Sequence, residues 1–179
     1  MHRIVSGITS LEQHFQAVST APVIYRPPAC PHCGRGVLWG HGCYYRKADR
    51  SRDPGPSRNP VPILRYCCPG CSRACSRLPL CIAPRRWYDW AVQQQVLLLL
   101  LNGYSLHHCS RCNDLGRQTV RRWRDWLNAR SESFMFFLRS RFPEWGRSVD
   151  QPSFWRLVLD SMPLAEVMAW LDREIDVPT

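Results

Sequence analysis

Lysine, acidic residues and long apolar runs are all scarce in this sequence. Only Lys47 among the 24 basic residues is a lysine, and with 14 Asp and Glu residues the formal net charge is +10. The longest apolar run, residues 96–101, is far shorter than the roughly 18 residues of a membrane span. No secretory signal is recognisable at the start of the sequence. These features predict a cytoplasmic protein without a membrane partner, and they favour a polyanionic partner such as nucleic acid.

Carboxylate clusters and the motifs of common enzyme classes are also missing. The sequence contains no glycine-rich phosphate loop, no Gly-X-Ser-X-Gly elbow and no His-Glu-X-X-His pair. A nuclease or transposase site needs several carboxylates that converge on Mg²⁺, whereas the acids of residues 131–179 are dispersed. We therefore predict no catalytic residues and no enzyme activity. A nuclease that uses the carboxylates of this tail is the competing hypothesis.

Cysteine, by contrast, is abundant, and its spacing is typical of a metal site. Eight of the ten cysteines lie within residues 23–82, where "CPHCG" (30–34) and "CPGCS" (68–72) share the pattern Cys-Pro-X-Cys followed by a small residue. Two intervening residues let a tight turn direct both sulfurs at one ion, and Zn²⁺ takes four such ligands at tetrahedral corners. The predicted ligands of this structural zinc ion are Cys30, Cys33, Cys68 and Cys71.

Other cysteine and histidine pairs leave alternatives open. Cys67 precedes the second motif, and on an extended strand its side chain points to the opposite face from that of the next residue. We interpret it as a packing residue, with replacement of one of the four ligands as the alternative, and we interpret Cys109 and Cys112 as packing residues too. His41 and Cys43 share one face of a predicted strand. A second metal at either of these pairs is the alternative.

The pattern of apolar residues predicts a mixture of strands and helices. Strands are expected at residues 37–46 and 61–67, on either side of an exposed Pro-, Gly- and Arg-rich loop at 47–60. Helices are expected at residues 10–18, 84–101, 106–112 and 117–130, with further amphipathic helices in the tail. We predict an α+β protein with four parts: an N-terminal helical segment (1–22), a zinc-ribbon β unit (23–82), a helix-turn-helix (84–130) and a helical C-terminal tail (131–179).

A helix-turn-helix is predicted from the helices at residues 106–112 and 117–130. Ser105 is a suitable N-cap for the first of them, and Asn113-Asp114 forms a tight turn before the second. In the second helix Val120, Trp123 and Leu127 form one apolar stripe.

Basic and polar residues occupy the other faces of that second helix. The N-terminal part of such a helix enters the major groove, where Arg hydrogen-bonds guanine and Gln hydrogen-bonds adenine. Base contacts are therefore predicted for Arg117, Gln118 and Arg121, and phosphate contacts for Thr119, Arg122 and Arg124.

Several stretches of residues 23–130 resemble a known family. They are "YRPPACPHCGRGVLWGHGCYYRKA", "RYCCPGCSRACSRLP" with "APRRWY", and "GRQTVRRWRDWL". They are similar to the zinc-ribbon and helix-turn-helix N-terminal part of bacterial insertion-sequence transposases, and to small stand-alone transposase-like proteins. The resemblance implies sequence-specific binding of double-stranded DNA. It implies no catalysis, because the RNase H-like domain of full transposases has no counterpart in this sequence.

The sequence therefore predicts a zinc-dependent, nucleoid-associated DNA-binding protein that is an accessory or regulatory factor of a mobile element. A separate transposase or a second copy of the chain is the further partner that this interpretation allows. The alternative is a protein-interaction adaptor that docks through its ribbon or its aromatic tail, or a transcription regulator.

Overall fold

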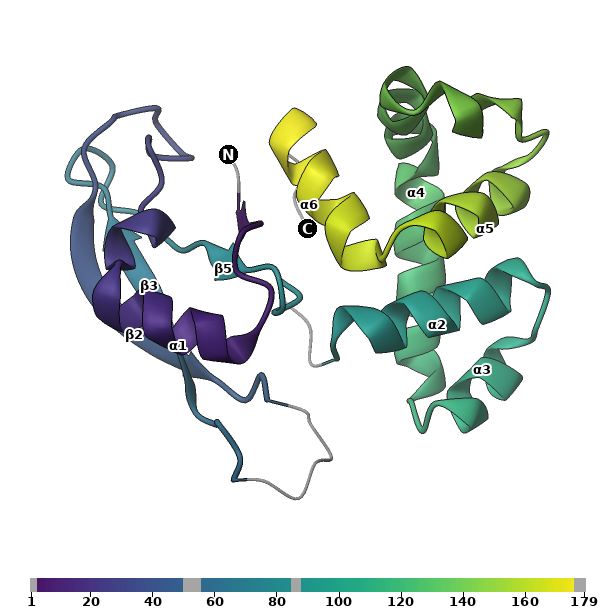
Figure 1. Ribbon diagram of the computed structural model, residues 1–179, viewed down its shortest axis with the longest axis horizontal. Coiled ribbons are helices and arrows are strands. Elements are labelled where there is room, and N and C mark those ends of the chain that lie inside the picture. The colour runs from purple at the N-terminus through teal and green to yellow at the C-terminus, as the bar shows by residue number, and fades with distance from the viewer. Residues whose placement is uncertain (1–2, 50–55, 85–87, 176–179) are drawn as a thin grey trace. The chain divides into compact units, whose positions relative to one another are not determined.

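The computed structural model describes residues 3–49, 56–84 and 88–175, and the chain divides into two compact units (Figure 1). The first unit lies within residues 1–89 and contains all the strands, and the second comprises residues 90–175 and is helical. The presence of both kinds of element with a four-cysteine cluster confirms the predicted α+β class. Residues 50–55 of the predicted loop lie outside the described residues.

The first unit is built on an antiparallel sheet. Its strands are β2 (Trp39–Arg46), β3 (Val61–Cys67) and β4 (Ala74–Cys75), in the order β2-β3-β4. The β2–β3 register shifts between Gly40 and Cys43, where Gly42 has a φ of 66° that favours glycine. Two very short strands, β1 (Ile4–Val5) and β5 (Leu78–Pro79), pair in parallel and were not predicted from the sequence.

The described ends of the loop between β2 and β3 are tied together by an asparagine. Asn59 Nδ2 donates to the Asp49 carbonyl at 2.8 Å, and the Asp49 backbone N–H donates to Asn59 Oδ1 at 3.0 Å. The Asp49 carboxylate also accepts from the Arg58 N–H at 2.6 Å. These contacts close the hairpin where it leaves the sheet.

One α-helix and one 3₁₀ helix cover β3. Helix α1 (Leu11–Thr20) is capped by Ser10, whose hydroxyl accepts from the Gln13 N–H, and η1 (Pro22–Tyr25) follows it. In Figure 1 α1 lies beside the sheet, and its apolar side chains pack on residues of β3. Arg77 joins distant segments by donating to the carbonyls of Ile24 and Ile4.

The second unit is a set of packed helices. They are α2 (Trp90–Leu101), α3 (Leu106–Cys112), α4 (Arg117–Arg141), η2 (Pro143–Arg147), α5 (Gln151–Ser161) and α6 (Leu164–Glu174). Helix α2 crosses α4 and also packs on α5 and α6 (Figure 1). None of the helices in the described part of the chain has both the length and the apolar character needed to cross a membrane.

Two predicted helix boundaries in this unit are wrong. The helix predicted at 84–101 begins at Trp90, since Pro84, Tyr88 and Asp89 are not helical, and residues 85–87 lie outside the described residues. The helix predicted at 117–130 continues to Arg141, because its buried stripe extends through Ser131, Phe134 and Leu138.

Buried and partly buried polar side chains join the helices of this unit. Ser131 Oγ donates to the Leu127 carbonyl and accepts hydrogen bonds of 2.8 Å from Trp155 Nε1 and Gln151 Nε2. Gln94 of α2 spans the α5–α6 turn, where its side chain bonds backbone groups on both sides at 2.8 and 2.7 Å. Because every one of these groups is paired, the network specifies how α2, α4 and α5 meet.

A buried histidine links α1 to the sheet in the first unit. His14 is 1% exposed, and its Nε2 lies 2.8 Å from the Pro62 carbonyl. A carbonyl only accepts, so Nε2 carries the proton and Nδ1 accepts from the Tyr25 hydroxyl at 2.6 Å. Burial lowers the pKa of His14 and exceeds the opposing effect of the Pro62 carbonyl. The imidazole is therefore held neutral.

We predict that acid destabilises the first unit through His14. The pKa of His14 is lower in the folded chain than its usual 6.5, so below pH 6.5 the unfolded chain binds more protons. The contribution of His14 to the free energy of unfolding is then fully present above pH 6.5. It decreases as the pH drops towards the folded pKa, by at most about 1.4 kcal/mol per pH unit.

The measurement is chemical denaturation at several pH values between 5 and 8. His14→Gln should show a shallower dependence than the natural chain, whereas His41→Gln, at an exposed position, should follow the natural chain. Acid also weakens metal–thiolate sites, so the difference between the two variants is the informative quantity. Identical pH profiles in both variants would contradict the role of His14.

Candidate metal centre and nucleic-acid interface

The two Cys-Pro-X-Cys segments fold into turns with the same hydrogen bonds, and we call these turns the knuckles (residues 30–35 and 68–73). In the first, the Cys30 N–H donates to the Arg35 carbonyl and the Gly34 N–H donates to the Cys30 carbonyl. In the second, Cys68, Arg73 and Ser72 make the equivalent pair of bonds. The small residue after each second cysteine has a left-handed backbone, with φ of 74° at Gly34 and 55° at Ser72.

The knuckles bring four sulfurs into one cluster. The sulfurs of Cys30, Cys33, Cys68 and Cys71 all lie within 4.8 Å of one another. The Cys30–Cys71 and Cys33–Cys68 separations are 3.6 and 3.5 Å, too long for disulfide bonds. A tetrahedron with Zn–S bonds of about 2.3 Å has S–S edges of about 3.8 Å. The cluster thus has the donor set and the size for a four-thiolate metal ion, and these are the residues that the spacing predicted.

The thiols of Cys68 and Cys71 influence each other's ionisation. Burial opposes ionisation of the Cys68 thiol, but the backbone N–H groups of Cys71 and Gly70 donate to its sulfur and lower its pKa to about 6. The Cys71 sulfur accepts from the Arg73 N–H, yet desolvation and the neighbouring thiols raise its pKa to about 12. Ionisation of Cys68 thus opposes ionisation of Cys71, and a metal ion that bound here would displace the proton of Cys71.

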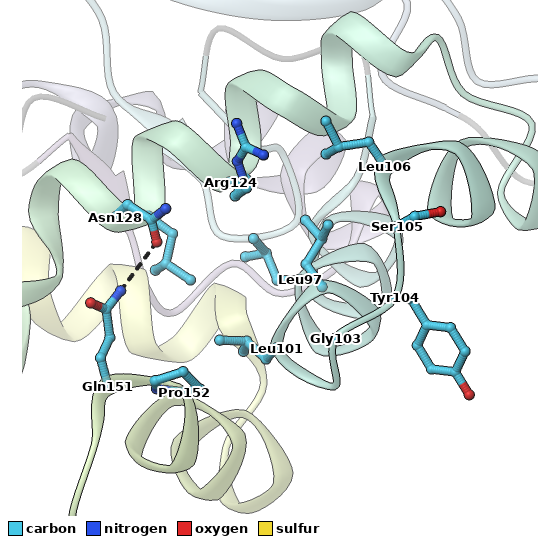
Figure 2. A pocket seen from close by; sticks show the side chains of 12 residues that line it. Leu97, Leu101, Gly103, Tyr104, Ser105, Leu106, Arg124, Asn128, Gln151 and Pro152 are labelled. Atoms are coloured by element: carbon cyan, nitrogen blue, oxygen red, sulfur yellow. Dashed lines mark hydrogen bonds between the residues drawn. The ribbon is translucent and has the colours of Figure 1, made fainter.

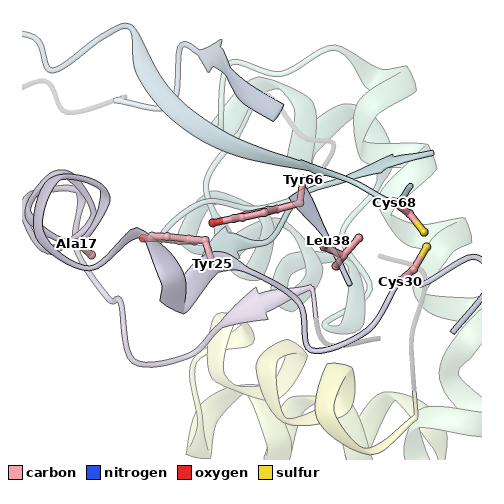
Figure 3. Close-up of a cluster of buried hydrophobic side chains, with 6 residues drawn as sticks. All are labelled: Ala17, Tyr25, Cys30, Leu38, Tyr66 and Cys68. Atoms are coloured by element: carbon pink, nitrogen blue, oxygen red, sulfur yellow. The ribbon is translucent and has the colours of Figure 1, made fainter. Parts of the chain in front are cut away.

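The cluster is joined directly to the core of the first unit. Cys30 and Cys68 are buried, and they belong to an apolar cluster with Leu38, Tyr25 and Tyr66 (Figure 3). The sulfurs of Cys30 and Cys68 point towards each other beside Leu38. A metal ion at this position would extend a core that is too small to hold the sheet by apolar packing alone.

The other predicted cysteine roles have mixed outcomes. Cys67 lies outside the four-sulfur cluster and is half-buried, and Cys109 of α3 is buried. The packing role predicted for Cys112 is wrong, because this residue is exposed with its sulfur 3.4 Å from His108 Nε2. Within the described residues no second group of three or more ligating side chains comes together, near Cys43 or elsewhere.

The helices α3 and α4 are joined by a well-bonded turn. The Leu115 N–H donates to the Ser110 carbonyl, the Ser110 hydroxyl donates back to the Leu115 carbonyl, and Asn113 Nδ2 donates to the Cys109 carbonyl at 3.1 Å. Asp114 adopts a left-handed φ of 51° that closes the turn. The turn thus holds the two helices at a defined angle.

The predicted DNA-contacting residues lie on the first two turns of α4. Arg117, Gln118, Arg121 and Arg122 are exposed, and Thr119 is partly buried. The stripe of Val120, Trp123 and Leu127 is buried, as predicted. Arg124 differs from the others, because its guanidinium donates twice to the Asp125 carboxylate at 2.8 and 2.9 Å. This ion pair makes it the weakest candidate for a phosphate contact.

Two arginines of the knuckles were not among the predicted site residues. Arg35 lies against Gly70 of the opposite knuckle, and Arg73 Nη1 lies 3.4 Å from His32 Nδ1, again of the opposite knuckle. The sequence signal for them is their equal offset, since each is the fifth residue after the first cysteine of its motif.

A cavity of about 510 Å³ lies in the second unit (Figure 2). Its lining comes from α2, α3, α4 and α5, with Leu97, Leu101 and Leu127 among the apolar residues and the bonded pair Asn128 and Gln151 at one end. Its lining contains no cysteine, histidine or acid. The hydroxyls of Tyr104 and Ser105 and the guanidinium of Arg124 also line it, so the cavity offers a mainly apolar surface with a few polar groups.

Comparison with protein-family models, with curated proteins and with solved structures finds no match to this chain. The resemblance to transposase N-terminal parts therefore stays a hypothesis based on the quoted motifs.

We predict that the two adjacent cysteines differ sharply when substituted. Cys68→Ser removes a cluster sulfur and should abolish stoichiometric metal binding, with a loss of folding free energy on the order of 10 kcal/mol for the first unit. Cys67→Ser should retain the metal, because its sulfur is outside the cluster. Metal content by mass spectrometry of the intact protein and chemical denaturation measure both effects. Equal metal loss in both variants would show that the ligand assignment is incorrect.

Proposed function

We propose that the protein binds double-stranded DNA through α3 and α4, which act as a helix-turn-helix, and that a structural Zn²⁺ ion holds its ribbon together. The observation that carries the proposal is the N-terminal part of α4. Its buried side packs into the unit while Arg117, Gln118, Arg121 and Arg122 are exposed together. Such side chains can hydrogen-bond base edges and phosphates when the start of the helix enters the major groove.

The residues at the start of α4 further support the proposal that this end of the helix enters the major groove. Its N-cap, Gly116, has no side chain to cap the helix, so the backbone N–H groups of Arg117 and Gln118 can donate to an incoming phosphate, while the Thr119 N–H donates to the Gly116 carbonyl. No acidic residue occupies the first turn, and the first acid along the helix, Asp125, is already paired with Arg124. The first turns of α4 therefore carry an excess of positive charge, with Asp114 of the preceding turn as the nearest acid before the helix, and this excess favours a DNA contact.

Zinc is the metal that the donor set favours. Four thiolates in a tetrahedral arrangement are typical of structural Zn²⁺, whereas Mg²⁺ and Ca²⁺ prefer oxygen ligands. All four positions would be occupied by cysteine, which leaves no open position for a catalytic water. We accordingly assign the ion a role in folding and propose no catalytic residues.

The biological setting proposed here follows from the resemblance to insertion-sequence transposases. A chain that binds specific DNA without its own catalytic site would serve as an accessory or regulatory factor of a mobile element. A separate transposase or a second copy of this chain would then be its partner. In this interpretation the protein works in the cytoplasm, in association with the nucleoid.

A protein-interaction adaptor is the second candidate. It is favoured by large apolar side chains that remain exposed in both units, including Trp39 of β2 at 62% and Phe136 of α4 at 68%. An adaptor would use such residues as anchors for a partner protein.

The first experiment is a selection of bound fragments from a sheared genomic library by the zinc-loaded protein. Enrichment of repeated element ends would support the mobile-element role, and enrichment of promoters would support a transcription regulator. If the folded, metal-loaded protein enriched no sequence, the adaptor would become the better interpretation.

The second experiment substitutes arginines of α4 and measures affinity for the selected duplex. Arg117→Gln and Arg121→Gln should each weaken binding by about 1–3 kcal/mol if the side chain contacts a base, and each should relax specificity at one position of the site. Arg147→Gln is the matched control, because it removes the same charge from an exposed position in η2 of the same unit. Equal losses in all three variants would indicate a general charge effect and contradict base contacts by α4.

A further inference from the structure

The positive charge is unevenly distributed between the two units. Residues 1–89 hold 13 of the 24 basic residues and only four of the 14 acidic ones. Residues 90–175, which include α4, hold 11 basic and nine acidic residues. The helical unit is therefore close to neutral, and most of the net charge belongs to the unit of the metal centre. A DNA contact restricted to α4 leaves this charge unexplained.

Two arginines of the first unit are placed by the knuckles themselves. Arg35 is the last residue of the first knuckle and lies on the second, where a Cβ added to Gly70 would come within 2.4 Å of Arg35 Cδ. Arg73 is the last residue of the second knuckle and lies on the first, with Nη1 3.4 Å from His32 Nδ1. Gly70 and His32 are equivalent residues, each the third of its knuckle. The arrangement is thus reciprocal, and each arginine bridges the two turns.

Both guanidinium groups are available to an external anion. Arg35 and Arg73 are exposed, and neither takes part in an ion pair with any described residue. Arg73 uses one N–H towards His32, and the Arg35 guanidinium makes no hydrogen bond to the described part of the chain. A guanidinium held against a rigid turn loses less freedom on binding than one on a free side chain, and its planar fork of donors matches the oxygens of a phosphate.

We propose that the two knuckles form a phosphate-binding site for the nucleic-acid backbone, with Arg35 and Arg73 as its donors. This inference rests on the proposed DNA-binding function and adds to α4 a second contact, which is independent of base sequence. The site depends on the metal centre, because the four sulfurs determine the spacing of the two turns and hence of the two arginines. The glycine at position 70 has a defined role in it, since it leaves room for the Arg35 side chain.

The test is the salt dependence of binding to a fluorescent duplex of random sequence. The double variant Arg35→Gln/Arg73→Gln should lower the slope of log affinity against log salt by about 2, or about one for each phosphate that is no longer neutralised. The matched control Arg58→Gln/Lys47→Gln removes two charges from exposed positions of the same unit and should change the slope less. Gly70→Ala keeps both charges but displaces Arg35, and should produce part of the effect of the double variant.

Metal content and resistance to denaturant are measured for each variant, and the proposal requires both to match the natural chain. A loss of metal in Arg35→Gln/Arg73→Gln would assign the arginines to the metal centre and overturn the proposal. Equal slope changes in the double variant and its control would overturn it as well. Equally strong competition by polyglutamate and by DNA would assign the site to an acidic protein instead.

The same titrations separate this inference from the proposed function. An unchanged slope in the knuckle variants, together with weaker binding in Arg117→Gln and Arg121→Gln, would refute the phosphate site and leave the role of α4 intact. Absence of DNA binding by the folded, metal-loaded natural chain at low salt would refute both.

Discussion

The meeting of four sulfurs is the constraint on which the first unit depends. The knuckles are 38 residues apart in sequence, and the cluster closes the hairpin of β2 and β3 between them. The two apolar clusters of the unit are small, and β2 is exposed along most of its length. A metal ion bound by the four sulfurs would compensate for this by removing freedom from the unfolded chain and by fixing the start and end of the hairpin. The position of α1, Tyr25 and Leu38 against the sheet follows from that closure.

The features that could be predicted from sequence are those determined by local patterns. The spacing in each Cys-Pro-X-Cys motif predicted which sulfurs meet, and the aromatic and β-branched residues beside the loop predicted β3 with its observed bounds. Serine at position 105 and the Asn113-Asp114 turn predicted α3 equally well. These patterns are reliable because capping, turn chemistry and ligand spacing act over a few residues.

The features that could not be predicted depend on contacts distant in sequence. Pro84 is a good first residue for a helix, yet it is buried outside α2, which begins only at Trp90. Ser131 looks like a polar interruption of α4, but its hydroxyl is buried and bonded to Leu127 and Trp155. Arg35 and Arg73 each lie against the opposite knuckle, which is possible only once the ribbon has closed. Their equal offsets in sequence could therefore not predict these contacts.

Helix α4 is one rod with two different ends. Its 25 residues extend for roughly 37 Å at about 1.5 Å per residue. Its first turns carry exposed arginines, and its last turns are embedded with Trp155 and Phe154 of α5. Helices α2 and α3 also pack on α4, so a tilt of α4 would move its arginines together with these neighbours. Changes in the packing of α5 and α6 on α4 would therefore shift the arginines at the start of α4 without contacting them directly.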